Sequence, residues 1–348
     1  MLRLTLCAFL AACGSSSDTP TTAPKIDDGV RYIYQLGEGS PDAAATVMRR
    51  RLARAKIKGW ASAQGATIVV DLAGTDAEAL AAARDLIART AKFQVLVVDD
   101  GDPIMRRLAE TAARDASAQA DGVEAAVDQW RPPSGDDRFD SYLRASDREE
   151  TVELATARRI GCFRRDLVDG GQRVRCRVTG RARLERYLGA VRQIDPSLAL
   201  PDDHQVAFER VTPHDRAPYW RTYYVVRAST LASPGIADAR PIVDPDSGRS
   251  AVLIEFDDDA RAAFAELSRA SVGKKLAFVL DDRVIIAPVI NAPVTSGRLT
   301  INLDDEAREG EARQLAIALA SGPLPGPVVE ASAAQLKDGQ VVADPNDF

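Results

Sequence analysis

Strand-like and helix-like segments alternate regularly between Val30 and Val98, and this alternation limits the possible folds more than any other feature. Two helical repeats of apolar residues are each opened by a cap, Ser40-Pro41 for the first and the capping-box sequence Thr75–Glu78 for the second. Three runs rich in β-branched and aromatic residues have the composition of strands: 30–36, 66–72 and 93–98. The resulting βαβαβ pattern predicts a small helix-on-sheet subdomain over residues 29–102.

The last third of the chain carries the clearest local signals. Apolar alternation, helix caps and turn residues predict four strands and two helices. The strands are 251–256, 276–280, 284–286 and 298–303, with Asp281-Asp282 as the tight turn between the second and third. The helices are 258–270, with Phe264 and Leu267 facing inward, and a segment capped by Asp304-Asp305 that carries Leu315, Ala316 and Leu319 and ends at Gly322-Pro323.

The middle of the chain, 103–230, has weaker patterns and is predicted as a variable insert. Cys162 and Cys176 flank what looks like two strands around a glycine turn. If residues 168–170 form a three-residue loop, the two cysteines face each other and can form a disulfide. Two separately buried thiols are the alternative, because a one-residue shift of register places the cysteines on opposite faces.

Residues 158–192 contain eleven arginines against three acidic residues, a local excess of +8 in a chain whose formal net charge is −6. One interpretation is a surface that faces anionic lipid headgroups or an acidic partner. The other is a solvated arginine-rich face. The chain as a whole, with a pI of about 5.2, has no electrostatic footprint for nucleic acid.

The N-terminal sequence predicts export and lipid attachment. Residues 1–12 have one arginine, an apolar stretch and Leu10-Ala11-Ala12 before Cys13, which is the arrangement of a bacterial lipoprotein signal peptide acylated at Cys13. An ordinary secretory signal with an incidental cysteine is the alternative. Residues 13–28 are rich in Ser, Thr, Pro and Asp and predict a disordered tether. We therefore expect a cell-envelope protein, lipid-anchored to a membrane and facing the periplasm.

The residue inventory gives no support for catalysis, a cofactor or a metal site. The chain has two histidines, His204 and His214, both in polar sequence, and no nucleophile–base arrangement can be built around them. Neither a dinucleotide fingerprint nor a P-loop occurs. The paired aspartates are accounted for as caps and turns. The apolar run 284–294 is shorter than the ~20 residues that cross a bilayer.

Four segments resemble the SecD family of protein-export factors, in the family's order. The first has a helix ending in an arginine-rich run, a Gln-Gly turn and an Ile-Val-Val strand. The second has the family's Gly-x-x-Asp-Ala element, the third its strand, aspartate turn and Ala-Pro run, and the fourth its helix ending in Ser-Gly-x-Leu-Pro. They are Thr46–Gly74, Pro234–Ala239, Leu276–Asn291 and Glu311–Pro325.

The resemblance implies an α+β fold with a ferredoxin-like base subdomain and a SecDF-type periplasmic head subdomain. The base is expected at 29–102 with a contribution from the C-terminal helix, the head and closing helix at 231–331, and a flexible tail at 332–348. Asp281-Asp282 departs from the family's Asp-Gly turn, and Asn302–Asp305 departs from its Gly-x-Phe-(Ser/Thr) element. The comparison with the family also leads us to expect that its membrane-spanning bundle, with its proton-driven motor, is missing from this chain.

The function implied by the resemblance is that of an accessory factor in Sec-dependent export. Such a factor binds translocating, unfolded polypeptide or the Sec channel proteins on the periplasmic side. The alternative is a structural or adaptor lipoprotein that keeps the head fold for envelope interactions unrelated to export. An envelope hydrolase is a third class, without a visible nucleophile–base pair.

Overall fold

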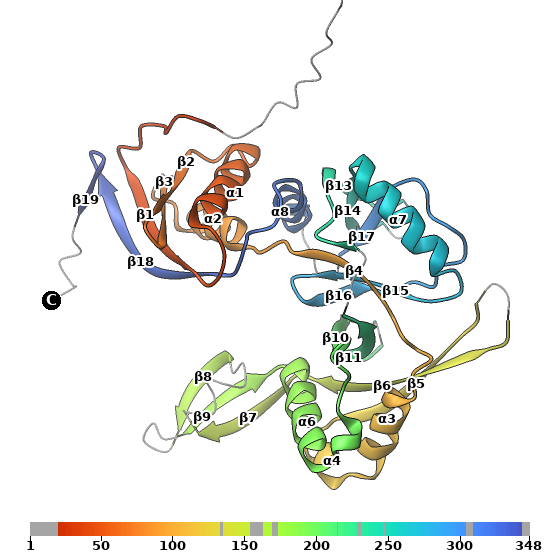
Figure 1. The fold of residues 1–348 in the computed structure, drawn as a ribbon. Helices are drawn as coiled ribbons and strands as arrows, with labels where there is room; N and C mark the ends of the chain where they lie inside the picture. The colour runs from red at the N-terminus through yellow and green to blue at the C-terminus, as the bar shows by residue number, and fades with distance from the viewer. Residues whose placement is uncertain are drawn as a thin grey trace, which may run out of the picture. The chain divides into compact units, whose positions relative to one another are not determined.

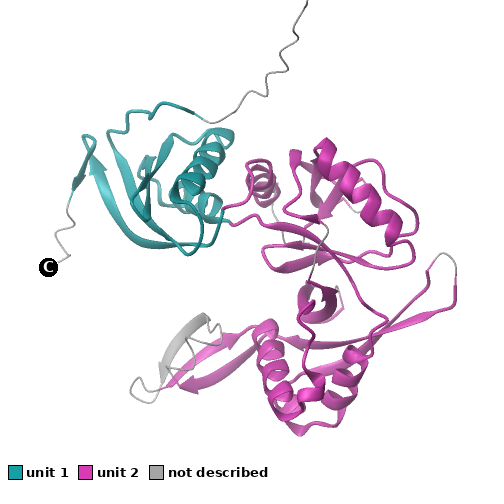
Figure 2. Cartoon of the chain, in the orientation of Figure 1, with its two compact units in different colours: residues 1–89, 325–348 teal, residues 90–324 magenta. Residues whose placement is uncertain are grey.

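The structure, a computed structural model, divides the chain into two compact units (Figure 2). Unit 1 joins residues 1–89 to 325–348, and unit 2 is residues 90–324. The described residues are 20–132, 135–153, 163–168, 173–213, 215–227, 231–245, 248–303 and 309–342, with the backbone alone at 163–168 and 309. The predicted signal peptide, Cys13, Cys162, His214 and the Asp304-Asp305 cap lie outside these ranges.

Unit 1 is a five-stranded sheet with two helices on it (Figure 1). Its elements are β1 (Gly29–Leu36), α1 (Pro41–Arg54), β2 (Gly59–Gln64), β3 (Thr67–Ala73), α2 (Ala77–Ala88), β18 (Val328–Lys337) and β19 (Gln340–Val342). The strand order is β19-β18-β1-β3-β2, and all pairs are antiparallel. Without β19, this is the βαββαβ arrangement of a ferredoxin-like fold, so the predicted fold class of the base is confirmed.

Local signals explain the helices of unit 1. Ser40 caps α1 by accepting a hydrogen bond from the amide of Ala43 at 3.4 Å, and Pro41 occupies the first turn. Asp76 caps α2 by accepting from the amide of Ala79 at 2.7 Å. Each helix buries one face against the sheet, and each fully buried Leu, Ile or Met contributes about 1.5–3 kcal/mol. These residues are Met48, Leu52, Leu86 and Ile87, opposite Ile68, Val70 and Leu72.

Two expectations for the base were wrong. The predicted third strand of the base, 93–98, is β4 (Phe93–Val97) and pairs in unit 2. Its place in the sheet of unit 1 is taken by β18, which pairs with β1 along the whole length of β1. Part of the predicted flexible tail 332–348 is therefore strand. The short strand β2 was not predicted, because its sequence, GWASAQ, contains no β-branched residue.

Unit 2 contains three sheets. The largest has the order β12-β4-β15-β16-β10-β11-β6-β5, and the two smaller ones have the orders β13-β14-β17 and β7-β9-β8. The elements up to residue 198 are β4, α3 (Ile104–Arg114), α4 (Ala116–Ala120), β5 (Glu124–Trp130), β6 (Arg138–Ser146), β7 (Arg148–Glu153), β8 (Phe163–Val168), β9 (Arg173–Val178), α6 (Gly180–Ile194) and a 3-10 turn, η2 (Pro196–Leu198). The elements after it are β10 (His204–Val211), β11 (Tyr219–Val226), β12 (Leu231–Ala232), β13 (Ile236–Val243), β14 (Ser250–Phe256), α7 (Asp258–Ala270), β15 (Leu276–Leu280), β16 (Arg283–Ile286), β17 (Arg298–Asn302) and α8 (Glu309–Ala320).

Strands from the head and from the insert share one sheet. β4 pairs with β15, β15 with β16, β16 with β10 and β10 with β11. A bridge between Val98 and Val225 links the end of β4 back to β11. Side chains from all five strands therefore gather in one cluster: Leu96, Val98, Ala207, Val225, Ala277, Val279 and Val284. The last third of the chain and the strands at 204–226 are parts of one structure.

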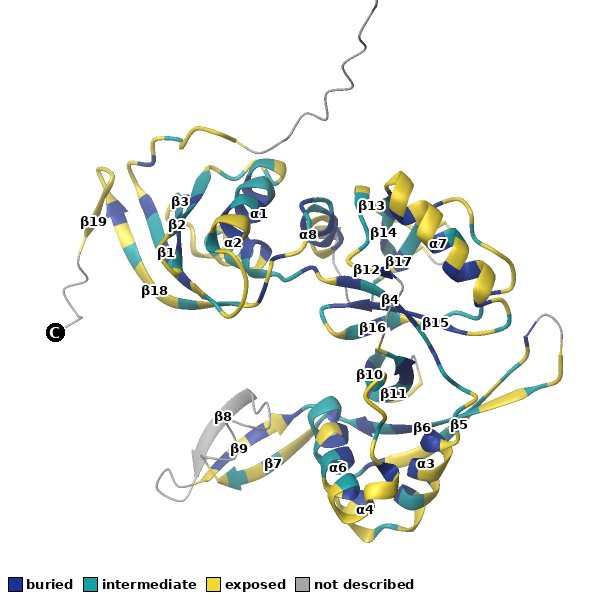
Figure 3. Cartoon of the chain, viewed as in Figure 1, coloured by how far each residue is buried: buried dark blue, intermediate teal, exposed yellow. Residues whose placement is uncertain are grey.

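Several predictions for the last third are confirmed. α7 spans 258–270 and β15 spans 276–280, as predicted, and Phe264 and Leu267 of α7 are buried. Figure 3 shows buried and exposed residues alternating along α7. Asp281 and Asp282 form the turn into β16, with φ of 50° and 59°. Two consecutive positive φ values characterise a type I′ hairpin turn, which matches the twist of the strands it joins.

Candidate functional site

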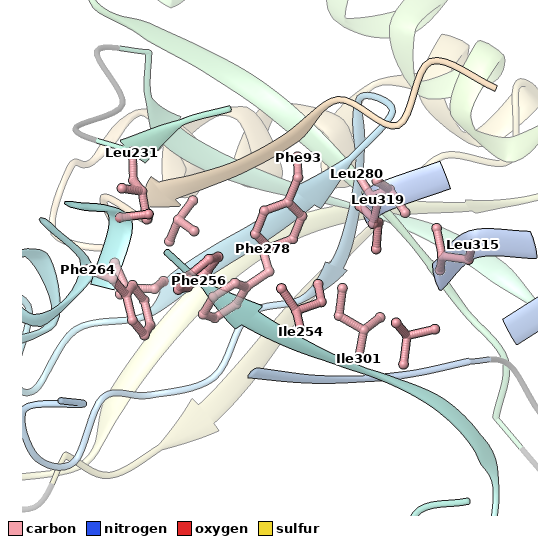
Figure 4. Packing of buried hydrophobic residues seen from close by; sticks show 14 of the residues in the cluster. Phe93, Leu231, Ile254, Phe256, Phe264, Phe278, Leu280, Ile301, Leu315 and Leu319 are labelled. Carbon is pink, nitrogen blue, oxygen red and sulfur yellow. The ribbon is translucent and has the colours of Figure 1, made fainter. Parts of the chain in front are cut away.

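The head is held together by an aromatic core under the sheet β13-β14-β17. Phe256 and Phe264 meet edge to face with ring centroids 5.5 Å apart, and Phe264 and Phe278 do so at 6.0 Å. Phe93 lies 6.4 Å from Phe278, so β4 joins the same core (Figure 4). Leu315 and Leu319 of α8 pack into it from the other side. A core of this density holds the sheet above it in a fixed shape.

Gly235 explains the Gly-x-x-Asp-Ala element of the sequence. A β-carbon at this position would lie 1.6 Å from Oδ2 of Asp257. Asp257 caps α7 by accepting from the amide of Ala260 at 2.8 Å, and its own amide donates to the carbonyl of Gly235 at 3.0 Å. Glycine is needed here because the backbone before β13 passes directly against the helix cap.

The strand β14 is the centre of the head sheet. It pairs with β13 on one side and with β17 on the other, and Val252 and Ile254 are fully buried. β14 therefore has no backbone groups free for a partner.

The strand β17 has one open side. The amide of Phe256 donates to the carbonyl of Gly297, and the amide of Leu303 donates to the carbonyl of Ser250. Because the direction of backbone groups alternates along a strand, the backbone of Arg298, Thr300 and Asn302 points away from β14. Among the described residues no strand pairs with that side. We call this row of backbone groups the β17 edge.

The surroundings of the β17 edge are accessible. Residues 291–293 and 295–296 of the preceding loop are exposed, and the amide of Arg298 is capped by Oγ of Ser296 at 3.3 Å. On the outer face of the sheet Glu255 forms ion pairs with Arg298 at 3.1 Å and with Arg240 at 3.3 Å. The face is charged, and no described strand pairs with the outer side of β17, so a partner would meet this side of the head by strand pairing and not through an apolar face.

The apolar run 284–294 is mostly not a surface. Val284 and Ile290 are buried, and the amide of Leu276 donates to the carbonyl of Pro288 at 3.1 Å, so the run continues the β15–β16 pairing. Ile286 is the large apolar side chain of this run that is most exposed, at 41%.

The cysteine hairpin is formed by β8 and β9, with a different loop from the predicted one. Val168 pairs with Arg173, so the connection spans residues 169–172 and not 168–170. Cys176 is buried in β9 and is disulfide-bonded. Its pairing with Cys162 stays a prediction, because Cys162 lies outside the described residues.

The positive charge of the arginines at 158–192 is partly balanced by glutamates of β7. Arg173 pairs in register with Glu153, and Arg177 with Glu149, whose side chains approach to 3.8 Å. On α6 the buried Arg183 lies 3.6 Å from Glu150. This balance favours the interpretation as a solvated, internally paired face over that of a lipid-headgroup surface.

His204 has carboxylates as its partners. Its Nδ1 lies 2.8 Å from Asp203 and its Nε2 3.2 Å from Asp99, and its ring stacks on Tyr224 at 4.6 Å. Within the described ranges no group of three or more His, Cys, Asp or Glu side chains is placed to hold a metal ion. Among the described helices none is long and apolar enough to cross a membrane.

The fold and the open edge together define a class of protein: an α+β protein whose head subdomain presents an open edge strand. Residues 209–326 match the protein-family model described as SecDF, P1 head subdomain. The SecD translocase subunit of Thermobaculum terrenum is 41% identical over 108 residues, which cover 31% of this chain and 20% of that protein. That of Anaeromyxobacter dehalogenans is 25% identical over 343 residues, covering 92% of this chain and 50% of that protein.

A crystal structure of SecDF in a super-membrane-facing form is also similar, with a TM-score of 0.49 and 21% identity over 88% of this chain and 30% of that one. These matches confirm the resemblance to the SecD/SecDF family seen in the sequence. The chain spans half or less of the length of these curated relatives.

Proposed function

We propose that this chain is an accessory factor in Sec-dependent protein export and binds unfolded secretory polypeptide at the β17 edge. The observation that carries the proposal is the open side of β17 within the part of the chain that matches the SecDF P1 head. An extended polypeptide adds to such an edge through main-chain hydrogen bonds, which exist in every sequence. Export clients differ in sequence, so recognition through the backbone suits them.

The proposed partners are the Sec translocon proteins and the translocating polypeptide. The names of the relatives, protein translocase subunits SecD and SecDF, support this choice. A lipid on Cys13 would hold the chain on a membrane facing the periplasm, with residues 13–28 as the tether. Acylation is tested by metabolic labelling with a fatty-acid analogue, which Cys13→Ala should abolish.

Site-specific photocrosslinking tests the proposal. A photoreactive residue is placed at Thr300 or Asn302 on the β17 edge, and at Asp259 or Arg269, exposed on α7, as matched controls. A secretory client is then stalled in the Sec channel. We expect adducts with the client from the edge positions and few from α7. Adducts from the edge only with other envelope proteins would favour the adaptor function and overturn the export proposal.

A further inference from the structure

A cleft lies in unit 2 where β6 and β11 separate. The pairing of these strands ends at Arg144 and Arg221, and Oγ1 of Thr222 accepts from the amide of Leu143 at 3.0 Å at the point of separation. Beyond this point β6 continues alone with β5. The cleft has a volume of about 420 Å³ and is lined by the turn 99–102, the start of α3, and parts of β5, β6 and β11.

One side of the cleft is acidic, and most of its carboxylates already have partners. Asp99 contacts His204. Asp102 accepts from the amide of Ile104 at 2.8 Å at the start of α3. Asp140 forms an ion pair with Lys275. These three carboxylates therefore already have partners within the protein.

Asp100 is the exception. Its side chain is 8% exposed, and Nη1 of Arg138 stands 3.8 Å from its Oδ1, beyond hydrogen-bond distance. Within the described part of the chain its Oδ2 has no hydrogen-bond partner. Burial, and then the neighbouring Asp140, raise the pKa of Asp100, against the opposing effect of Arg138 and Lys275. A buried carboxylate oxygen without a donor costs free energy that a ligand's donor would recover.

Tyr224 gives an independent second observation. It also lines the cleft and is 2% exposed, and its hydroxyl has no hydrogen-bond partner among the described residues. Burial, and then the carboxylates of Asp102 and Asp99, raise the pKa of Tyr224 to about 12. The hydroxyl therefore stays neutral at physiological pH. Two unsatisfied polar groups on separate elements thus line one cleft.

The other side of the cleft is apolar and open. Val127 of β5 and Phe139 of β6 line it and are 59% and 63% exposed. Two arginines also line the cleft: Arg106, which is exposed, and Arg221, which is already held 2.5 Å from Asp128 and 3.9 Å above the ring of Tyr142. The arrangement thus offers one carboxylate, Asp100, whose Oδ2 has no donor among the described residues, beside an apolar shelf.

We propose that this cleft takes a lysine or arginine side chain of an extended polypeptide, with an adjacent apolar side chain on Val127 and Phe139. Charge complementarity selects the occupant, since Asp100 can pair with one cation and the shelf suits the residue next to it. The bound cation would take the place of the half-exposed Arg138, whose Nη1 lies 3.8 Å from Asp100. The inference rests on the proposed function, because it assigns a preference to the polypeptide bound, and it adds a site separate from the β17 edge.

The test measures binding of labelled peptides to the full chain by fluorescence anisotropy. One peptide has a central lysine between leucine and valine residues, and its matched partner has norleucine in place of the lysine. Asp100→Asn removes the charge, and Asp259→Asn on the exposed start of α7 is the charge-matched control. Phe139→Ser tests the shelf. Thermal unfolding checks that every variant folds, which is expected of Asp100→Asn because an amide replaces a buried carboxylate.

We expect the wild type to prefer the lysine peptide by about tenfold, as one charge-assisted hydrogen bond provides. Asp100→Asn should abolish this preference and Asp259→Asn should keep it, while Phe139→Ser should weaken both peptides. Equal binding of the two peptides by the wild type, or a preference that survives in Asp100→Asn, overturns the inference. If the peptide test overturns the inference, photocrosslinked adducts at Thr300 still support the proposed function. The absence of those adducts would contradict both the inference and the proposed function.

Discussion

A single close approach, between Gly235 and Asp257, couples the start of β13 to the start of α7. Replacing Gly235 by alanine forces Asp257 out of its capping position, and we expect a loss of about 2–3 kcal/mol in the free energy of unfolding, from the lost cap and the displaced backbone. Gly310→Ala is the control, since among the described residues nothing beyond its chain neighbours and the nearby backbone of α8 lies within 4 Å of a β-carbon at that position. Denaturant unfolding measures both. Equal stabilities for the two variants would contradict this account of the motif.

His204 gives the chain a pH-dependent contribution to stability. Burial lowers the pKa of His204, but hydrogen bonds to Asp203 and Asp99 outweigh it and raise the pKa above its ordinary value. A raised folded-state pKa stabilises the fold below the unfolded-state pKa of ~6.5, and the contribution is lost as the pH rises through the folded-state pKa.

The prediction for His204→Gln follows from this stabilisation at low pH. The variant should lose more stability relative to the wild type at about pH 5.5 than at about pH 8.5, measured as the shift in Tm at each pH. A shift of the same size at both pH values would show that the two carboxylates do not favour the charged imidazole.

At the scale of elements, Arg51 links the two helices of unit 1 by hydrogen bonds. It lies on α1, is fully buried, and donates to the carbonyls of Leu86 and Ile87 at 3.2 and 3.1 Å and to that of Arg89. These carbonyls are at the C-terminal end of α2, where a positive charge is favourable.

Arg51→Leu should therefore destabilise unit 1 by about 3 kcal/mol, because several buried carbonyls lose a charged donor at once. Arg54→Leu, an exposed arginine of the same helix, should cost less than about 1 kcal/mol. Hydrogen exchange of the α2 amides reports the effect on the element itself. Unchanged protection of the α2 amides in Arg51→Leu would contradict this role of Arg51.

Elements with local signals could be predicted from the sequence, and their partners could not. The capping residue Asp257 and the inward-facing Phe264 and Leu267 predict α7. The paired aspartates predict the β15–β16 turn. Which sheet receives a strand depends on pairings distant in sequence, so β4 was assigned to the base and β18 to a tail. The alternation in 251–256 likewise identifies a strand without showing that it is central, whereas the less apolar β17 is one of the two edge strands of the same sheet.

At the scale of the whole molecule, each unit has its own sheet and its own buried core. Unit 1 is completed by residues from both ends of the chain, and unit 2 combines the head with the insert in one eight-stranded sheet. The insert at 103–230 is therefore part of the structure that carries the head, and its strands β10 and β11 support β15 and β16. The recognised head motifs alone do not define a separate folding unit here.

The central claim is that polypeptide pairs with the β17 edge, and Thr300→Pro tests it most directly. Proline at 300 removes an outward amide without removing a hydrogen bond to β14, and edge strands tolerate it. Thr300→Val is the matched control, because it changes the side chain and keeps the amide. The measurement is the affinity of the full chain for an unfolded secretory polypeptide, with the Tm of each variant confirming the fold. We predict a loss of about tenfold or more for Thr300→Pro and little change for Thr300→Val. A folded Thr300→Pro variant that binds as tightly as the wild type would contradict the claim.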